Sequence, residues 1–231
     1  HVHSTATIAN AISQSSESDL KKYLDEDFIF VPYCRPGFTL TMEIKKLILP
    51  STNILILENH GLIVAGDDIE DTYKLLLKIH KKLDLIRNEK LASDYLEEVT
   101  NIDGYNHKNT DKYKLFSTQD EKLFSLFPKS FYPDHVIFLG PGIPTFLEEK
   151  EANEFIQNLK RKNMNLPPYL ILKYKGLFEN TLAIPAAKEM IDCFLEVLLR
   201  IDLSKSLKFL SSLQESELLN WDIEIYRQSI N

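Results

Sequence analysis

The first residues of the chain have a spacing that suits metal binding. In the opening stretch HVHST, one residue separates His1 from His3. Residues i and i+2 of a β-strand project from the same face, so both imidazoles would point toward one centre. A metal site needs a third ligand, and the best candidate is His60, which lies beside Gly61 at the end of an apolar run. Three neutral imidazoles around a divalent ion leave one position open, as in catalytic zinc sites.

A plainer interpretation of these residues stays open at this stage. His1 and His3 could belong to an exposed terminus or a residual tag, and His60 could serve only a turn, because His-x-His spacing is common. Glu58 could orient a ligand or act as a general acid or base, but a glutamate at a strand end is often simply exposed. The remaining histidines are expected to be structural or exposed: His80, His107 and His135.

The first part of the chain alternates helical and strand patterns around these histidines. Residues 4–14 predict a helix with Ser4 or Thr5 as its N-cap, and residues 28–31 predict a short strand. The apolar run at 54–58 predicts a strand buried on both faces, followed by a hairpin partner. Further helices are predicted at 39–49 and at 67–91, the second with Asp67 and Glu70 as a capping pair.

The alternation continues after a polar segment. Residues 100–113 are rich in turn-forming residues and predict a linker between a domain at 1–99 and a C-terminal α/β subdomain at 114–231. The elements predicted beyond the linker are helices near 118–127, 148–163, 185–200 and 218–228, and strands at 135–140, 169–174 and 176–179. Alternating strands and helices indicate a layered α/β fold.

Composition argues against several classes of partner. The chain has 231 residues, 44% of them hydrophobic, so it can bury a sizeable core. Its formal net charge of -7 argues against a nucleic-acid partner. The longest apolar runs are too short to cross a membrane, and no signal peptide precedes them. The two cysteines, Cys34 and Cys193, are far apart in sequence and are expected to be buried thiols of a reducing compartment, which predicts a cytoplasmic protein.

Several segments, in order along the chain, resemble the class II aldolase/adducin superfamily. They carry His-x-His, then Pro-Tyr-x-x-Pro-Gly, then Asn-His-Gly with an apolar strand and a capped helix: HVHSTATIANAI, VPYCRPGF and ENHGLIVAGDDIEDTY. The resemblance extends to the aldolase part of bifunctional rhamnulose-1-phosphate aldolase/alcohol dehydrogenase proteins. Their later sequence is more loosely similar to YPDHVIFLG, PYLILKYKGLF and AAKEMIDCFLEVLLR.

The resemblance implies a three-layer α/β/α fold assembled as a homo-oligomer, usually a tetramer with active sites near subunit interfaces. It also implies a Zn²⁺ ion, or another divalent metal, held by His1, His3 and His60. Such a metal would bind the hydroxyl and carbonyl oxygens of a phosphorylated ketose and stabilise the enediolate formed on carbon–carbon cleavage. The expected activity is that of a metal-dependent aldehyde-lyase in carbohydrate metabolism, with a small sugar phosphate as its substrate.

The chain departs from the aldolase pattern in one respect. The catalytic glutamate of those enzymes lies upstream of His-x-His, and residue 1 here is a histidine rather than a methionine, so we expect the N-terminal portion of the fold to precede this sequence. The resemblance does not transfer that glutamate's role to Glu58. Two alternatives stay open: a sugar-phosphate epimerase or dehydratase of the same superfamily, and a non-catalytic adducin-like interaction domain. Adducin-type domains tend to lack the metal ligands.

Overall fold

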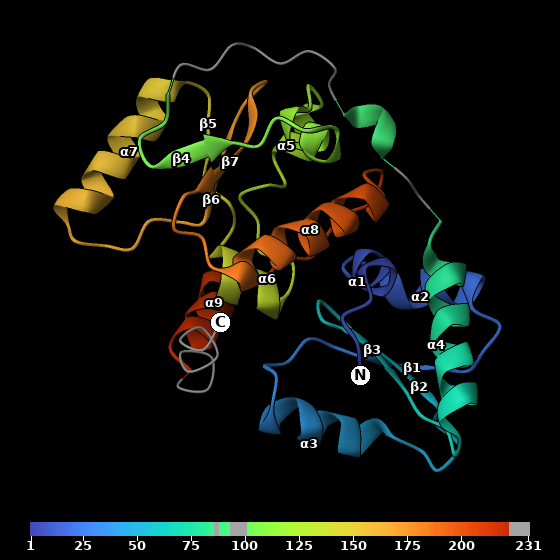
Figure 1. The fold of residues 1–231 in the computed structure, drawn as a ribbon. Coiled ribbons are helices and arrows are strands. Elements are labelled where there is room, and N and C mark those ends of the chain that lie inside the picture. The colour runs from blue at the N-terminus through green and yellow to red at the C-terminus, as the bar shows by residue number, and fades with distance from the viewer. Residues whose placement is uncertain (86–87, 93–100, 222–231) are drawn as a thin grey trace. The chain divides into compact units, whose positions relative to one another are not determined.

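A computed structural model describes residues 1–85, 88–92 and 101–221 (Figure 1). These residues form two compact units that interleave along the chain. The first unit contains residues 1–85, 131–133 and 196–218, and the second contains residues 88–92, 101–130, 134–195 and 219–221. The chain therefore leaves the first unit and returns to it twice.

The first unit contains a small mixed sheet and its helices. In chain order, its elements are α1 (Thr5–Ala11), α2 (Ser16–Tyr23), β1 (Ile29–Val31), α3 (Phe38–Leu47), β2 (Ile54–Leu57), β3 (Gly61–Val64), α4 (Ile69–Leu83) and nearly all of α9 (Ser212–Leu219). β1 runs parallel to β2, and β3 pairs with β2 as an antiparallel hairpin, which gives the order β1-β2-β3. The predicted strand at 28–31, the buried hairpin and the helix at 39–49 are confirmed.

β2 is the central strand, and helices cover both of its faces. Ile54 and Ile56 pack with residues of α1, α2 and α4, whereas Leu55 and Leu57 pack with residues of α3. Figure 1 shows α3 on one side of this sheet and α1, α2 and α4 on the opposite side. An unbroken apolar run is what a strand with two covered faces requires. The mixed α/β structure agrees with the predicted fold class, while the three-layer aldolase-like fold and its upstream portion stay predictions.

The two helices beside the histidines begin at defined caps. α1 follows Ser4, whose hydroxyl accepts the N–H of Thr7, and this confirms one of the two predicted caps. α4 follows Asp68, whose carboxylate accepts the N–H of Glu70 at 2.8 Å. The prediction of Asp67 as this cap is wrong, because Asp68 has the extended backbone that an N-cap requires. The helix ends at Leu83, short of the predicted residue 91, and a 3-10 turn, η1 (Glu89–Leu91), follows.

The second unit contains a four-stranded mixed sheet. Its elements are β4 (Tyr105–His107), η2 (Asp111–Ser117), α5 (Glu121–Phe124), α6 (Pro133–Leu139, from its second residue), β5 (Thr145–Phe146), α7 (Glu149–Arg161), β6 (Tyr169–Leu172), β7 (Gly176–Asn180) and α8 (Pro185–Arg200), which enters the first unit at residue 196. The strand order is β4-β7-β6-β5. α7 packs on this sheet through Ala152 and Ile156, as part of one apolar cluster with Leu170 and Phe178.

Most elements predicted for the second part are confirmed, with different bounds. The strands at 169–174 and 176–179 are β6 and β7, and the helices at 148–163 and 185–200 are α7 and α8. The helix predicted near 118–127 is reduced to the single turn of α5, which begins after Asp120, whose carboxylate accepts the N–H of Leu123. The helix predicted at 218–228 lies largely outside the described residues.

The sequence predicts a loop over residues 100–113, but part of this range is a strand. β4 lies within this range and pairs antiparallel with β7, with Tyr105 opposite Asn180. Tyr105 is buried, and its hydroxyl donates to the carbonyl of Pro167 at 2.7 Å. A short edge strand with polar side chains resembles a loop in sequence, because only one of its faces is covered. The domain boundaries at residues 99 and 113 stay predictions.

The predicted strand at 135–140 is wrong, because these residues belong to the helix α6. Pro133 occupies the first helical position and Asp134 lies in the first turn, and both favour a helix start. Gly140, with a φ of 93°, follows the helix, and its N–H bonds to the carbonyl of Val136. A short apolar run fits a buried strand or a buried helix equally well, so the signals at its two ends decide.

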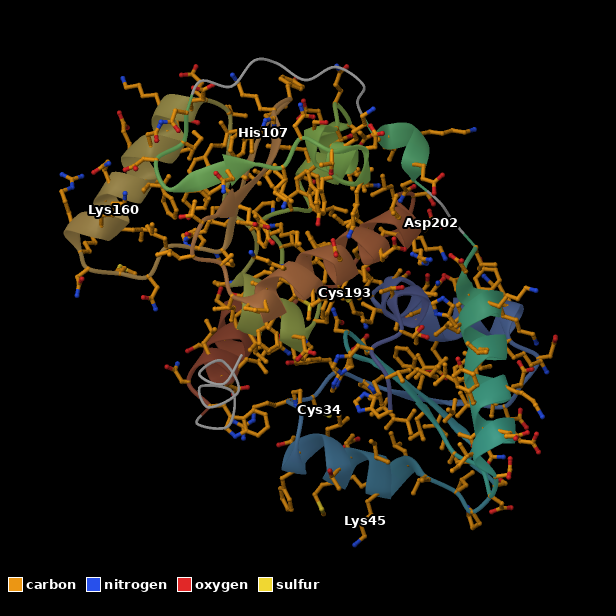
Figure 2. All side chains as sticks on the ribbon, in the orientation of Figure 1. Cys34, Lys45, His107, Lys160, Cys193 and Asp202 are labelled. Atoms are coloured by element: carbon orange, nitrogen blue, oxygen red, sulfur yellow. The ribbon has the colours of Figure 1, made fainter. Side chains whose placement is uncertain are left out.

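Two further predictions concern the burial of the cysteines and the absence of a membrane-spanning segment. Figure 2 shows Cys34 between β1 and α3, and Cys193 on α8. Neither cysteine forms a disulfide, as predicted, but each is half-buried rather than fully buried. Burial raises the pKa of Cys34. Within the described ranges, every helix is too short or too polar to span a membrane.

His135 predicts a pH dependence of stability. The residue is fully buried in α6 beside the ring of Phe194, and burial lowers its pKa from 6.5 to about 3. The unfolded chain therefore binds a proton below pH 6.5 that the folded chain excludes, so stability falls as pH falls through this window. Between pH 7.5 and pH 4.5 we expect His135 to account for a loss of about 3 kcal/mol, because the window spans about two units below the pKa of the unfolded chain.

Urea unfolding of the wild-type protein and of His135→Leu at several pH values checks this expectation. The variant should lose less stability than the wild type over the same interval. Equal losses in both proteins would show that His135 is not the group responsible.

Candidate metal centre

His1, His3 and His60 lie together in the first unit. Each offers one ring nitrogen, and these three atoms lie within 4.8 Å of one another. The ring centroids of His1 and His3 are 5.2 Å apart, and each lies 5.0 Å from that of His60, so the rings form a nearly equilateral triangle. Among the described residues, this is the one group of three or more His, Cys, Asp or Glu side chains with such a geometry. The structure thus brings together the three residues that the sequence singles out.

A backbone bridge places His1 and His3 beside the hairpin. The N–H of Val2 donates to the carbonyl of Leu62, and the N–H of Leu62 donates to the carbonyl of Val2, each at 2.9 Å. Residues 1–3 thereby extend the sheet by one short antiparallel segment next to β3. Because Val2 makes the bridge, the residues on either side of it share the opposite face, which is the face toward His60.

The turn between β2 and β3 positions His60 through its neighbour Asn59. Asn59 has a φ of 52°, in the left-handed region that asparagine tolerates better than most residues. Its side-chain amide is buried and donates to the carbonyl of Phe131 at 2.8 Å and to that of Lys208 at 3.0 Å. The N–H of His60 then bonds to the carbonyl of Leu57 at 3.2 Å. These bonds fix the direction in which the His60 ring leaves the hairpin.

Gly61 allows the two ligand-bearing segments to approach each other. A Cβ atom at this position would lie 2.5 Å from the carbonyl oxygen of Val2 and 3.2 Å from the Cα of His3. Both of these atoms belong to the backbone, which cannot rotate away as a side chain can. The glycine is therefore required by the short distance between the hairpin and the His-x-His segment.

A further contact holds the chain immediately after His3. Ser4 is buried, and its hydroxyl lies 2.9 Å from Nδ1 of His80, within hydrogen-bond distance. His80 lies in α4, so this contact joins the start of α1 to the long helix. His80 is half-buried, in agreement with its predicted structural role, and it does not belong to the histidine cluster. His107 and His135 both lie in the second unit.

The donor set fits a divalent metal such as zinc. Three imidazoles are borderline ligands that suit Zn²⁺, and a site with three protein ligands leaves a position for water or substrate. His60 is 6% exposed and comes from a hydrogen-bonded turn, whereas His1 is exposed. One side of the cluster is thus fixed in the fold, and the other is open to solvent.

A cavity of about 460 Å³ lies beside His1. It is formed by the end of β3 and the first turns of α4, and its apolar walls include Val64, Ile69 and Leu76. Among the described residues that line it, Asp67 and Asp68 are the acidic ones. Its volume lies within the range of small-molecule sites, which typically measure roughly 300–1,000 Å³.

Comparison with known proteins finds a family that matches this part of the chain. Residues 1–85 match the family described as Class II Aldolase and Adducin N-terminal domain, and this range contains all three histidines and the strands β1–β3. Residues 1–85 are therefore similar to a class II aldolase/adducin domain, and this matched range is called the aldolase/adducin domain below. The "Uncharacterized oxidoreductase YuxG" of Bacillus subtilis (strain 168) is 27% identical over 93 residues, which cover 39% of this chain and only 14% of that protein. No solved structure matches the chain.

Glu58 of the aldolase/adducin domain is engaged in contacts on both carboxylate oxygens. One oxygen accepts the backbone N–H of Tyr33 at 3.0 Å, and the other pairs with the ammonium of Lys208. Glu58 is 7% exposed, so the interpretation of it as an exposed strand-end residue is wrong. Tyr33 comes from the Pro-Tyr-x-x-Pro-Gly motif, and burial raises the pKa of its phenol. The second motif is thereby joined to Glu58, which lies two residues before His60.

Asn59 and Lys208 support the site, although sequence spacing assigns no role to either. Asn59 could have been recognised from its type and place, because asparagine before a glycine-containing turn often adopts positive φ. Lys208 lies 150 residues after Glu58 and outside the range of the family match. No local pattern marks it, since its role depends on the return of a distant segment to the first unit.

We predict that Gly61→Ala weakens metal binding by the aldolase/adducin domain. The added methyl group must displace the backbone of Val2 and His3, which moves two of the three imidazoles. Titration with Co²⁺, followed by absorption, should show an affinity at least about tenfold lower than that of the wild type.

Gly66→Ala is the matched control for this change. A Cβ at Gly66 would meet the hydroxyl of Thr72 at 2.6 Å, which belongs to a side chain that can rotate away. This variant should keep the wild-type affinity. Unchanged Co²⁺ binding in Gly61→Ala would contradict the role given to the glycine.

Proposed function

We propose that this chain is the metal-binding part of an aldolase-like lyase that cleaves or forms a carbon–carbon bond in a phosphorylated ketose. His1, His3 and His60 are the proposed ligands of Zn²⁺ or another divalent ion. The observation that carries the proposal is the convergence of the three ring nitrogens within 4.8 Å of one another. The family match supports the class of reaction, because the matched domain is that of the class II aldolases and adducins.

A bound divalent ion would supply Lewis-acid stabilisation of the negative charge that develops on the ketose oxygens. The protein's own contribution is to hold the ligands before substrate arrives. His60 is fixed by the turn hydrogen bonds, while His1 and His3 are fixed by the bridge between Val2 and Leu62. Preorganised ligands lower the cost of ordering the site in each turnover.

The cavity beside His1 is the proposed place for the part of the substrate that carries no phosphate. Its apolar walls and the carboxylates of Asp67 and Asp68 disfavour a phosphate group, which would be repelled by like charge. The phosphate would therefore point away from this wall. Asp68 is also engaged in capping α4, so its carboxylate is held in place.

Glu58 is better suited to a supporting role than to that of the general acid or base. Its oxygens are occupied by the N–H of Tyr33 and the ammonium of Lys208. These contacts hold the side chain in a buried position, whereas a general base must come within hydrogen-bond reach of the substrate proton. We propose that the catalytic glutamate comes from sequence that precedes His1, as in the class II aldolases that this chain resembles.

The partners follow from the resemblance and the location follows from the cysteine content, and both are part of the proposal. They are a small sugar phosphate as substrate, a homo-oligomer, most simply a tetramer, and a cytoplasmic site of action. The relative is described as an oxidoreductase and is matched over 14% of its length. We propose that this chain corresponds to the aldolase part of such a larger, bifunctional protein.

The metal proposal predicts that His60→Ala abolishes stoichiometric metal binding. The full-length protein should contain one divalent ion per chain by elemental analysis, and the variant should contain much less, because one of three ligands is lost. His107→Ala is the matched control, since His107 lies in the second unit and bonds to the carbonyl of Lys175 at 2.7 Å. A wild-type protein without metal, or a variant that retains it, would refute the proposal.

The reaction is tested on a panel of ketose phosphates. A lyase releases an aldehyde, an epimerase forms an isomeric sugar, and a dehydratase releases water, although all three would use the same ligands. We expect aldehyde release that depends on added divalent metal and is lost in His60→Ala. Epimer formation or water loss alone would assign the site to another enzyme of the superfamily, and a metal-free, inactive protein would indicate an adducin-like interaction domain.

A further inference from the structure

Residues 205–209, here called the return segment, lie in the connection between α8 and α9 within the first unit. The segment pairs with the chain that follows α1, through an antiparallel bridge between Leu207 and Ser13. The N–H of Lys208 donates to the carbonyl of Ile12 at 2.6 Å, and the N–H of Gln14 donates to the carbonyl of Ser206 at 3.0 Å. The return segment is thus hydrogen-bonded to the aldolase/adducin domain as a short strand.

Side chains fix both ends of the return segment. The ammonium of Lys205 lies 2.8 Å from the carboxylate of Asp19 in α2, and hydrogen bonds from Lys205 and Lys22 lower the pKa of Asp19 well below its usual range. At the other end, the ring of Phe209 packs edge-on against that of Phe131, with centroids 5.2 Å apart. The segment between these two contacts therefore has little freedom to move.

The return segment contacts the turn that carries His60 at two points. The carbonyl of Lys208 accepts a hydrogen bond from the buried amide of Asn59. The ammonium of Lys208 pairs with the buried carboxylate of Glu58. Glu58 and Asn59 are the two residues that immediately precede His60, so both contacts act on the backbone from which the ligand projects.

The turn depends on these contacts for physical reasons. Asn59 adopts a positive φ, which is unfavourable for most residues and persists where surrounding bonds determine it. Glu58 is a buried carboxylate, and a buried charge without its partner is strongly destabilising. If the contacts to Lys208 were lost, Glu58 would tend to move toward water and Asn59 would lose one of its two acceptors. Either change would shift His60.

We infer that the return segment is a positioning element of the metal centre. Through Asn59 and Glu58 it holds the His60 turn in the geometry that completes the histidine cluster. The domain defined by the family match, residues 1–85, is therefore completed by residues that lie more than a hundred positions later. The expected effect on metal affinity rests on the proposed function, whereas the effect on the turn does not.

The variant Asn59→Gly tests the effect of the two side-chain hydrogen bonds separately from the effect of the positive φ. Glycine adopts positive φ without strain, so the variant keeps the turn accessible but removes both bonds to distant carbonyls. Asn163→Gly is the matched control, because Asn163 also has a φ of 52° but is exposed at the end of α7. Both variants are made in the full-length protein, and circular dichroism checks that they fold.

Two measurements are made on each variant. Hydrogen–deuterium exchange of residues 57–62, without metal, reports on the amides of Glu58 and His60, which bond to Val31 and Leu57. Titration with Co²⁺, followed by absorption, reports on the metal site. We expect Asn59→Gly to raise exchange at both amides and to lower Co²⁺ affinity about ten- to hundredfold. Asn163→Gly should match the wild type in both measurements.

Lys208 supplies a second, independent test, which also serves if Asn59→Gly does not fold. Lys208→Met leaves Glu58 without its cation and should raise exchange and weaken Co²⁺ binding. Lys208→Arg keeps the charge and should restore both. In the double variant Glu58→Gln/Lys208→Met no buried charge remains, so exchange and affinity should return part of the way toward the wild type.

The outcomes separate this inference from the proposed function. Faster exchange and weaker Co²⁺ binding in Asn59→Gly and Lys208→Met, with rescue by Lys208→Arg, support it. If the wild type binds no Co²⁺ but exchange still changes in this pattern, the proposed function fails and the positioning role stands. Wild-type exchange and wild-type Co²⁺ affinity in both variants would overturn the inference.

Discussion

The antiparallel bridge between Val2 and Leu62 is the contact on which the histidine cluster depends. Its two backbone hydrogen bonds place residues 1–3 against β3, and the alternation of side chains along an extended segment then turns His1 and His3 toward His60. The bridge needs a close approach of two backbones, which Gly61 permits. The cluster is therefore a consequence of backbone pairing, because both paired segments supply histidines to it.

The Asn-His-Gly motif has a separate physical reason for each residue. Asn59 adopts the left-handed turn and bonds to two distant carbonyls, His60 projects its ring toward the cluster, and Gly61 leaves room for the neighbouring segment. A motif of this kind specifies a backbone path as much as a chemical group. It also explains how a domain of modest size can bring together three histidines from segments that are far apart in sequence.

The supporting contacts of the site extend beyond the family domain. Glu58 links the Pro-Tyr-x-x-Pro-Gly motif, through the N–H of Tyr33, to Lys208 in the return segment. The same segment is hydrogen-bonded to the chain after α1 and ion-paired with α2. A carboxylate two residues before a candidate metal ligand can thus serve the fold rather than the chemistry. This role suits the expectation that the acid or base comes from elsewhere in the polypeptide.

Local sequence was sufficient for the buried strand β2, the caps near Ser4 and the grouping of His1 with His3, because each depends on the periodicity of a few neighbouring residues. It was insufficient at 135–140, where an apolar run fits a helix or a strand, and at 100–113, where a polar edge strand resembles a loop. The approach of His60 to the other histidines and the support from Lys208 were decided by tertiary structure. Contacts between residues 60 to 150 positions apart leave no trace in local periodicity, because they exist only after the chain has folded.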